Sequence, residues 1–538
     1  MYTYNRRWNA WGTSDSPFLT TLSDGARQAL ALLVGESTPL QDVDLAEILA
    51  KVPASRLSEN ALISVDNEDR LRHAKGQSLP DWMDLRSGNV TVFPDGVAFP
   101  ESSAEVKQLF EYAEHNDVEI IPYGGGTSVV GHINPLASDK SVLTIDMGKM
   151  NKLLDFDAES QIATFGAGTT GPELEAQLKE LGYTLGHYPQ SWELSTVGGW
   201  VASRSSGQQS LRYGRIEQLF AGGRLETLQG TFDIPAIPAS SAGPDVREMI
   251  LGSEGRMGIL TEVKVRVTAL PECETFHVAF LPNWEKGVET IRTLAQNKLQ
   301  LSMLRLSNLM ETITMLYSNS DADAMAALNA TMTAAGMDDN KVMLTFGVSG
   351  LAEQNKFALE QTVSLIEQMG GAMAPDAMGV HWAQGRFGAP YWRETLWQAG
   401  YAVDTMETSV NWSKVIESVA KIEQAISSQA LASGSKAHVY THLSHVYGQG
   451  CSLYTTYLFS CKDSFDSTFD LWRSIKSYGA AATVAQGGTI SHQHGVGFDH
   501  KDYLLAEKGD MGISAIRQVL QVFDPSGRMN PGKLLPDE

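Results

Sequence analysis

The chain has 538 residues, of which 43% are hydrophobic and 19% are charged. This composition is ordinary for a globular protein, and the length exceeds what one hydrophobic core supports, so about two to three domains are expected. The formal net charge of −22 repels phosphate backbones. It argues against nucleic acid as a partner and against a purely electrostatic attachment to anionic membranes.

The first half of the chain alternates between helix and strand patterns. Residues 1–85 are predicted to form a helical N-terminal region, with helices at 24–34 and 42–52, the second ended by Pro53. A strand is predicted at 97–100, a helix at 103–114 with Ser102 or Ser103 as its N-cap, and a strand at 119–122. This α/β pattern extends to about Val267 and predicts a domain over residues 86–271.

The second half contains another α/β pattern and a glycine-rich end. Residues 272–478 are predicted to form a second domain, with a strand at 275–280 and a helix at 284–297. The Ala- and Met-rich stretch 321–337 is interpreted as a helical excursion of that domain rather than as a cofactor-binding segment. Residues 479–538 return to glycine-rich sequence and form a separate C-terminal segment.

The cysteines and the apolar runs indicate where the protein is found. Cys273, Cys451 and Cys461 form neither a CxxC pair nor a disulfide framework, which is typical of a reducing compartment. The N-terminal residues show no apolar signal segment, and no apolar run reaches the ~20 residues of a spanning helix. The sequence predicts a cytoplasmic protein, in which a local apolar or basic patch would carry any peripheral membrane contact.

The most informative motif is the glycine run at residues 122–129, which follows a strand-like segment. Consecutive N–H groups in such a turn can point at a bound pyrophosphate. The spacing is neither GxGxxG nor GxxxxGK[ST], so a nicotinamide fold and an ATPase loop are both disfavoured. Two more loops rich in glycine and hydroxyl residues occur at 195–207 and 252–262. Together the three loops suit a long dinucleotide that lies across a groove.

In order and spacing, these loops resemble the FAD domain of the vanillyl-alcohol oxidase superfamily. The resemblance implies an α+β fold, with a two-subdomain FAD-binding domain, an α/β cap domain for the substrate, and a C-terminal segment that completes the flavin site. Covalent members carry a histidine after the first glycine run, where this chain has Thr127, so noncovalent FAD is expected. The implied cofactor-binding residues are Pro122, Gly124, Gly125, Gly126, Thr127, Ser128, Ser195, Thr196, Gly199, Ser203, Glu254, Gly258 and Ile259.

Two histidines and two arginines are further candidates for chemistry. His492 and His494 are separated by one residue, so on an extended segment they face the same side. Such a pair can transfer protons, bind phosphate or bind a metal, but with no cysteine nearby a structural zinc site is disfavoured and no metal is predicted. Arg305 lies in apolar sequence and Arg393 follows two aromatics. An arginine fork matches phosphate or carboxylate, although an ordinary salt bridge is the simpler interpretation of each.

Together with residues 7–12 and the tyrosine-containing run 451–459, these motifs resemble the alkyl-dihydroxyacetone-phosphate synthase family over nearly the whole chain. That family replaces the acyl chain of acyl-dihydroxyacetone phosphate with a fatty alcohol in ether lipid synthesis, and uses its flavin without net redox change. The resemblance implies that Tyr454 is the acid/base residue, with His492 and His494 also catalytic. It further implies a small-molecule or lipid-phosphate substrate bound by Arg305 and Arg393. A homodimer is expected.

Two positions depart from that family. Gln493 replaces the middle histidine of a triple-histidine motif, and an amide cannot shuttle a proton. His442 stands roughly where the family has an arginine, so a differently shaped or weaker phosphate site is expected there. The rival interpretation is an FAD-dependent dehydrogenase of a 2-hydroxy acid or related alcohol, whose Ser-x-Glu-His-Gly phrase Gln493 also fails to match. A non-catalytic flavin-binding sensor is a third alternative, against which the tyrosine, arginine and histidine set argues.

Overall fold

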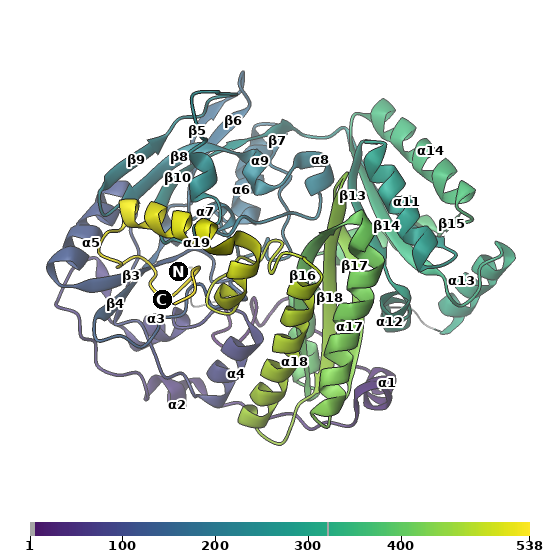
Figure 1. The fold of residues 1–538 in the computed structure, drawn as a ribbon, viewed down its shortest axis with the longest axis horizontal. Coiled ribbons are helices and arrows are strands. Elements are labelled where there is room, and N and C mark those ends of the chain that lie inside the picture. Colours follow the sequence, from purple (N-terminus) through teal and green to yellow (C-terminus); the bar gives the residue numbers. More distant parts are fainter. Residues whose placement is uncertain (1–5, 320–321, 538) are drawn as a thin grey trace.

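The computed structural model describes residues 6–319 and 322–537. It contains a four-stranded and a five-stranded sheet in one half of the molecule and a seven-stranded sheet in the other, with the C-terminal helix crossing back over the first half (Figure 1). This arrangement confirms the expected α+β class, with two subdomains for the cofactor and a cap. The domain limits at residues 85, 271 and 478 stay predictions.

The first subdomain is a small, mainly parallel sheet that ends in the glycine run. Its order is β1-β2-β4-β3, and β2, β4 and β3 are parallel. Helix α5 (Ser103–His115) begins at Ser102, whose hydroxyl accepts from the Glu105 N–H, and buries Leu109 and Phe110 against this sheet. The strands are β1 (Ile63–Ser64), β2 (Gly96–Ala98), β3 (Val118–Tyr123) and β4 (Ser141–Asp146).

The second subdomain is an antiparallel sheet in the order β5-β6-β10-β8-β9. Its core contains Phe165, Trp200 and Phe220, and Ile513 and Leu520 of helix α19 join the same core. Figure 1 shows α19 lying across this subdomain. The elements are β5 (Leu153–Asp157), β6 (Ile162–Gly166), β8 (Phe220–Thr227), β9 (Gly230–Ile234), β10 (Ile259–Arg266), α6 (Gly171–Glu180), α7 (Val197–Ser203), α8 (Ser210–Tyr213), α9 (Ile216–Leu219), α10 (Arg247–Ile250) and α19 (Leu504–Phe523); the short strands β7 (Tyr183–Thr184) and β11 (Thr268–Ala269) pair beside them.

The cap is built on a seven-stranded antiparallel sheet in the order β15-β12-β14-β13-β17-β18-β16. Helices α11, α14, α17 and α18 cover one face and form the largest hydrophobic core, whereas α12, α13 and α15 lie on the other face. The strands are β12 (Cys273–Leu281), β13 (Leu301–Ser307), β14 (Val342–Gly350), β15 (Ala372–Met373), β16 (Tyr401–Asn411), β17 (Ala437–Val446) and β18 (Gly450–Ser460). The helices are α11 (Trp284–Gln296), α12 (Leu309–Asn319), α13 (Ala322–Ala334), α14 (Ala352–Gln368), α15 (Asp376–Gly385), α16 (Ala389–Trp397), α17 (Val415–Ala432) and α18 (Phe465–Ala485).

The period-2 alternation of strand side chains determines what each face of the cap sheet carries. On β14, Leu344 and Phe346 point into the helix-covered core, and Thr345 between them lines a cavity. On β18, Leu453 lies in the core and Tyr454 lines the cavity. The polar residues of these strands therefore gather on the face that α12 and α15 share.

Several predicted elements are confirmed, and one is wrong in length. Helix α1 (Asp24–Val34) has the predicted bounds, but α2 (Leu45–Leu49) is shorter than the predicted 42–52. The polar region before residue 85 adds two helices, α3 (Asn67–Arg72) and α4 (Leu79–Ser87). The Ala- and Met-rich stretch forms α13 in the cap; residue 321 at its start, like residues 1–5, lies outside the described residues.

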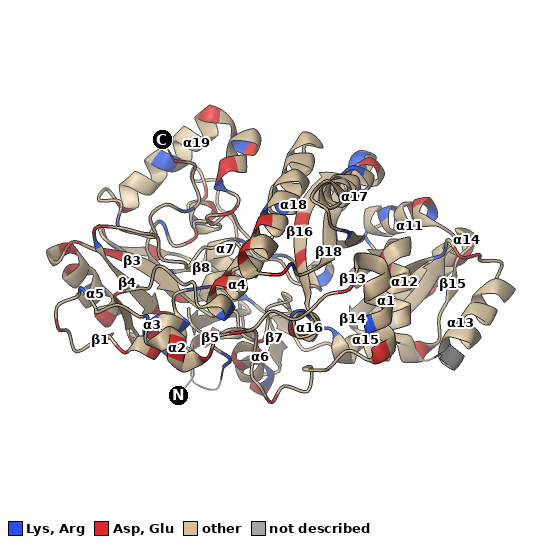
Figure 2. Ribbon diagram, turned by 90° about the horizontal axis from the view of Figure 1, so that it is seen from below, with Lys and Arg blue, Asp and Glu red and all other residues tan. Residues whose placement is uncertain are grey.

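The surface charge is mixed rather than separated into one-sign faces. Figure 2 shows acidic and basic residues interspersed over both halves of the molecule. In the described part of the chain, every helix is too short or too polar to cross a membrane.

A buried ion-pair network ties the N-terminal region to the cap. Arg86 on α4, whose side chain is fully buried, binds both Asp42 and Glu394 on α16. Arg7 binds the other oxygen of Glu394 at 2.7 Å. Because Glu394 compensates two arginines at once, its charge holds together three segments that are distant in the sequence.

We expect Glu394→Gln to lower the free energy of unfolding by about 3 to 5 kcal/mol, because Arg86 then lacks most of its compensation in a buried position. Glu47→Gln is the matched control: it removes one carboxylate from the exposed Lys51–Glu47 pair, with 57% of the Glu47 side chain accessible, and should cost less than about 1 kcal/mol. Urea unfolding of both variants measures the difference. Equal midpoints would contradict the structural role of the network.

Candidate active site

A cavity of about 930 Å³ lies between the two FAD-type subdomains and the cap sheet. One wall consists of the glycine-rich loops, and the other of side chains from β13, β14, β17, β18, α12 and α15. All of the predicted cofactor-binding residues line it, from Pro122 to Ile259. Their contacts with FAD itself stay predictions.

The glycine run lies so close to the second loop that side chains are excluded. A Cβ at Gly125 would lie 1.8 Å from the Leu194 carbonyl oxygen, and one at Gly124 would lie 2.4 Å from the Thr196 hydroxyl. Gly126 has a φ of +68°, in the left-handed region that favours glycine. The two loops can therefore form one continuous wall only with glycine at these positions.

The third loop is joined to the C-terminal segment through Glu254. Its carboxylate accepts hydrogen bonds from the backbone N–H groups of Val496 and Gly497, and its Oε1 lies 3.1 Å from Nε2 of His132. Nδ1 of His132 in turn lies 2.9 Å from the Ser128 hydroxyl. Sequence reasoning missed His132, although its position four residues after Ser128 is a signal that was available.

On the cap wall, Tyr454, His442 and Arg305 come together. His442 and Tyr454 are direct neighbours across β17 and β18, and their rings stack with centroids 4.8 Å apart. Arg305 lies 3.0 Å from Nδ1 of His442 and forms a 2.8 Å ion pair with Glu311 on α12. Burial alone would raise the pKa of Glu311, but Arg305 and then His442 outweigh it and lower the pKa to about 2. The charge of Arg305 is thus already balanced by an acid that the sequence did not indicate.

Arg393 also lines the cavity, from helix α16. It donates to the carbonyl of Gln77, lies over the ring of Trp82, and is 3.7 Å from a carboxylate oxygen of Asp404. Both predicted arginines therefore face the cavity, and both have an acidic partner.

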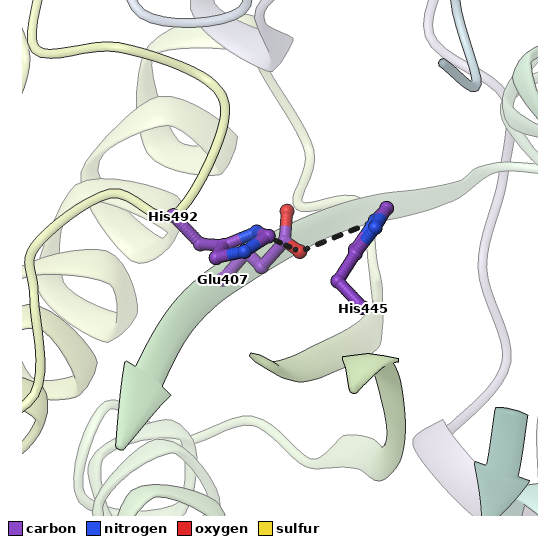
Figure 3. A group of neighbouring side chains, drawn as sticks. All are labelled: Glu407, His445 and His492. Atoms are coloured by element: carbon purple, nitrogen blue, oxygen red, sulfur yellow. Dashed lines mark hydrogen bonds and ion pairs between the residues drawn. The ribbon is translucent and has the colours of Figure 1, made fainter. Parts of the chain in front are cut away.

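Glu407, a carboxylate that sequence reasoning missed, lies between His492 and His445 (Figure 3). Glu407 on β16 is fully buried and accepts from Nδ1 of His492 at 3.0 Å and from the Gln493 amide at 2.8 Å. His494 and His445 lie within 3.7 and 4.0 Å of the same carboxylate. Gln493 thus anchors the segment, a role that its amide performs without moving a proton.

The same cluster has the residue types of a metal site, since ligand atoms of Glu407, His445 and His492 lie within 4.8 Å of one another. Nε2 of His492, however, faces the guanidinium of Arg215 at 2.9 Å. Arginine only donates, so Nε2 is an acceptor and the ring proton sits on Nδ1, directed at Glu407. A proton there occupies the direction that a metal ion needs, so the geometry favours a hydrogen-bond network.

The pKa values of Tyr454 and His494 are shifted in opposite directions. Burial raises the pKa of Tyr454 to about 12, and the nearby charge of Glu407 acts in the same direction. Burial lowers the pKa of His494, so its imidazole is neutral at pH 7. His494 lines the cavity, while the buried His492 lies behind it, next to Glu407.

Beyond these polar groups, the cavity continues as an apolar arm into the cap. The arm lies between the sheet and helices α12 and α15, and methionines contribute much of its surface. Its apolar lining residues are Val278, Met303, Met315, Leu316, Met343, Met378 and Trp382.

Comparisons with known proteins identify the class. Residues 94–232 match the family model "FAD binding domain" and residues 270–534 match "FAD linked oxidases, C-terminal domain". The cradle of glycines that a Cβ would fill fits such a cofactor, so the protein is an FAD-linked enzyme.

The family follows from individual relatives. An alkyldihydroxyacetonephosphate synthase of Dictyostelium discoideum is 31% identical over 88% of this chain and 78% of its own length. One from Caenorhabditis elegans is 29% identical over 97% and 93%. A solved alkyldihydroxyacetonephosphate synthase structure superposes with a TM-score of 0.83 at 25% identity, over 99% of both chains. The chain belongs to the alkyldihydroxyacetonephosphate synthase family.

We expect Gly125→Ala to weaken FAD binding by about tenfold or more, because the added methyl group meets a backbone carbonyl that cannot move aside cheaply. Gly25→Ala on α1, where the space around the new methyl group is open, is the control and should retain full flavin. Flavin absorbance per protein measures occupancy. Acid precipitation of the wild type should leave the yellow cofactor in the supernatant; flavin in the pellet would contradict noncovalent binding.

Proposed function

We propose that this protein exchanges the acyl chain of an acyl-dihydroxyacetone phosphate for a fatty alcohol. The observation that carries the proposal is the lining of its cavity, in which apolar side chains of the cap adjoin the polar side chains of Arg305, His442 and Tyr454. A substrate with a long hydrocarbon chain and a charged head group matches both parts. The names of the relatives at 28% to 31% identity support the same activity.

The apolar arm favours this activity over the rival 2-hydroxy-acid dehydrogenase. A small hydroxy acid needs only a few polar contacts, and burying it would leave the arm unfilled. Methionines such as Met303, Met315 and Met343 adapt to chains of different length, since their side chains are unbranched and flexible. Burying each CH₂ of a fatty chain contributes about 0.8 kcal/mol to binding.

The catalytic proposal rests on Tyr454 and His494. Tyr454 is the general acid or base at the substrate carbon, as the resemblance implies, and His494 is a neutral imidazole beside it, with ring centroids 6.2 Å apart. FAD, which the glycine-rich loops would hold, would supply an electron-accepting ring. His492 binds Glu407. This hydrogen bond positions the segment that carries His494.

The remaining proposals concern binding and location. Arg305, Arg393 and His442 bind the polar end of the substrate. The protein is a cytoplasmic homodimer that contacts membranes peripherally. That contact is supported by Met310, Ile313 and Tyr317, which lie exposed on α12 beside the apolar arm.

Anaerobic mixing tests the function. With acyl-dihydroxyacetone phosphate and a labelled fatty alcohol, we expect the label in the ether product and no bleaching of the flavin absorbance. D-lactate, D-2-hydroxyglutarate and glycolate should leave the flavin oxidised. Bleaching by one of these acids, with no exchange, would refute the synthase activity and favour the dehydrogenase.

Tyr454→Phe and His494→Ala identify the proton acceptor. If Tyr454 is the base, its Phe variant should bind FAD normally and lose about a hundredfold or more in rate. Deuterium at the substrate carbon next to the carbonyl should also stop washing out. Persistence of exchange in Tyr454→Phe but not in His494→Ala would assign the role to the histidine.

The pH profile gives an independent readout. A phenol with a pKa of about 12 is ionised at pH 7 in on the order of one molecule in 10⁵. If the phenolate is the base, kcat/KM should rise about tenfold per pH unit between pH 6 and 9. Because burial lowers the pKa of His494, a histidine base should give a flat profile above pH 7 and a decline at a lower pH than an ordinary imidazole.

A further inference from the structure

In the described part of the chain, one arginine of the cavity lining has no ion-pair partner. The lining includes three arginines, Arg305, Arg386 and Arg393. Arg305 is paired with Glu311 at 2.8 Å and Arg393 with Asp404 at 3.7 Å. Among residues 6–319 and 322–537, Arg386 has neither an ion pair within 4 Å nor a side-chain hydrogen bond, and its buried terminal nitrogen NH1 has no partner atom.

The carboxylates near the cavity do not form an ion pair with Arg386. The two carboxylates in its lining are Glu254, which is engaged by His132 and two backbone N–H groups, and Glu311, which is engaged by Arg305. Glu274 and Glu175 act on Arg386 only through space. The carboxylate of Glu274 accepts from Gln209, and that of Glu175 accepts from Thr184 and from two backbone N–H groups. The charge of Arg386 is thus available to a ligand.

The position of Arg386 is rigid, which is what a binding residue needs. Its guanidinium lies over the rings of Tyr188, Phe276 and Phe387, at 4.9 to 5.2 Å from their centroids. The amides of Gln190 and Gln208 both donate to its backbone carbonyl, at 3.0 and 3.2 Å. Aromatic faces hold an arginine without consuming its N–H donors, so the fork stays free for a bidentate partner.

We propose that Arg386 binds the phosphate group of the substrate. A phosphate monoester offers the oxygens that the planar fork of arginine matches, and it supplies the negative charge that this part of the cavity lacks. The neutralised pairs of Arg305 and Arg393 then orient the head group by hydrogen bonds, while Arg386 provides the net attraction. This inference rests on the proposed function for the identity of the phosphate-bearing molecule.

Calorimetric titration of the FAD-loaded protein with inorganic phosphate tests the proposal. In Arg386→Met, we expect the Kd for phosphate to rise about 10- to 100-fold, the loss of one charge-assisted bidentate contact. Arg473→Met is the matched control, because Arg473 also lies over an aromatic ring, that of Phe469, but on the surface of α18. Its phosphate affinity should equal that of the wild type.

The other outcomes are equally defined. Unchanged phosphate affinity in Arg386→Met, or no phosphate binding by the wild type, would overturn the proposal. Loss of flavin from Arg386→Met would overturn it too, since Arg386 would then serve the cofactor. Weaker binding of acetate alone would show that a carboxylate is recognised instead. If the Met variant does not fold, Arg386→Lys keeps the charge without the fork and should weaken binding about 3- to 10-fold.

The proposed function can fail separately. If the wild type shows no acyl-for-alkyl exchange but phosphate binding still depends on Arg386, the assignment of Arg386 stands and the exchange activity is refuted. If exchange occurs but the affinity for phosphate does not depend on Arg386, the exchange activity stands and the assignment of Arg386 is refuted.

Discussion

The geometry of the active site depends on one buried carboxylate, that of Glu407. An unpaired buried charge would cost several kcal/mol, so strand β16 can be buried in this way only if partners reach its carboxylate. The partners come from the C-terminal segment, where His492 and Gln493 satisfy one oxygen each. Because they are bound, the next residue, His494, is held against the cavity beside Tyr454. A structural requirement of the cap thus positions a catalytic candidate.

A second carboxylate sets the electrostatics of the substrate wall. Glu311 neutralises Arg305 and contacts His442, so this wall carries little net charge in spite of its ionisable groups. The positive charge in the cavity that lacks an ion-pair partner is that of Arg386, which caps the C-terminal end of helix α15. In a protein with a net charge of −22, one uncompensated guanidinium in a low-dielectric cavity is a strong local determinant of which anion binds.

The amphipathic character of the cavity follows from the sheet. Alternate residues of β13, β14, β17 and β18 face the helix-covered core, which requires apolar side chains, and the others are free to be polar or apolar. Strands β17 and β18 contribute His442 and Tyr454, whereas β13 contributes Met303 and Arg305 and β14 contributes Met343 and Thr345. One sheet therefore supplies both the polar and the apolar lining of the cavity.

Features that depend on neighbouring residues were predictable from the sequence. The glycine run, the helix at 24–34 and the strand before Gly124 require only local backbone preferences and hydrophobic periodicity, and they agree with the structure. The predicted helix 42–52 was too long, since α2 ends at Leu49, ahead of Pro53. A proline restricts the residues before it, and a hydrophobic pattern does not show how far this effect extends.

Pairings between distant residues were decided only by the tertiary structure. Glu407 meets His492 across 85 positions, and Arg86 meets Glu394 across 308. The first contact joins β16 to the C-terminal segment and the second joins α4 to α16, and local sequence patterns do not encode such pairings. The sequence by itself determined the cofactor loops and the types of side chain available for chemistry. The fold decided which charges are neutralised and which, as at Arg386, are left for a ligand, because charge compensation depends on distance in space.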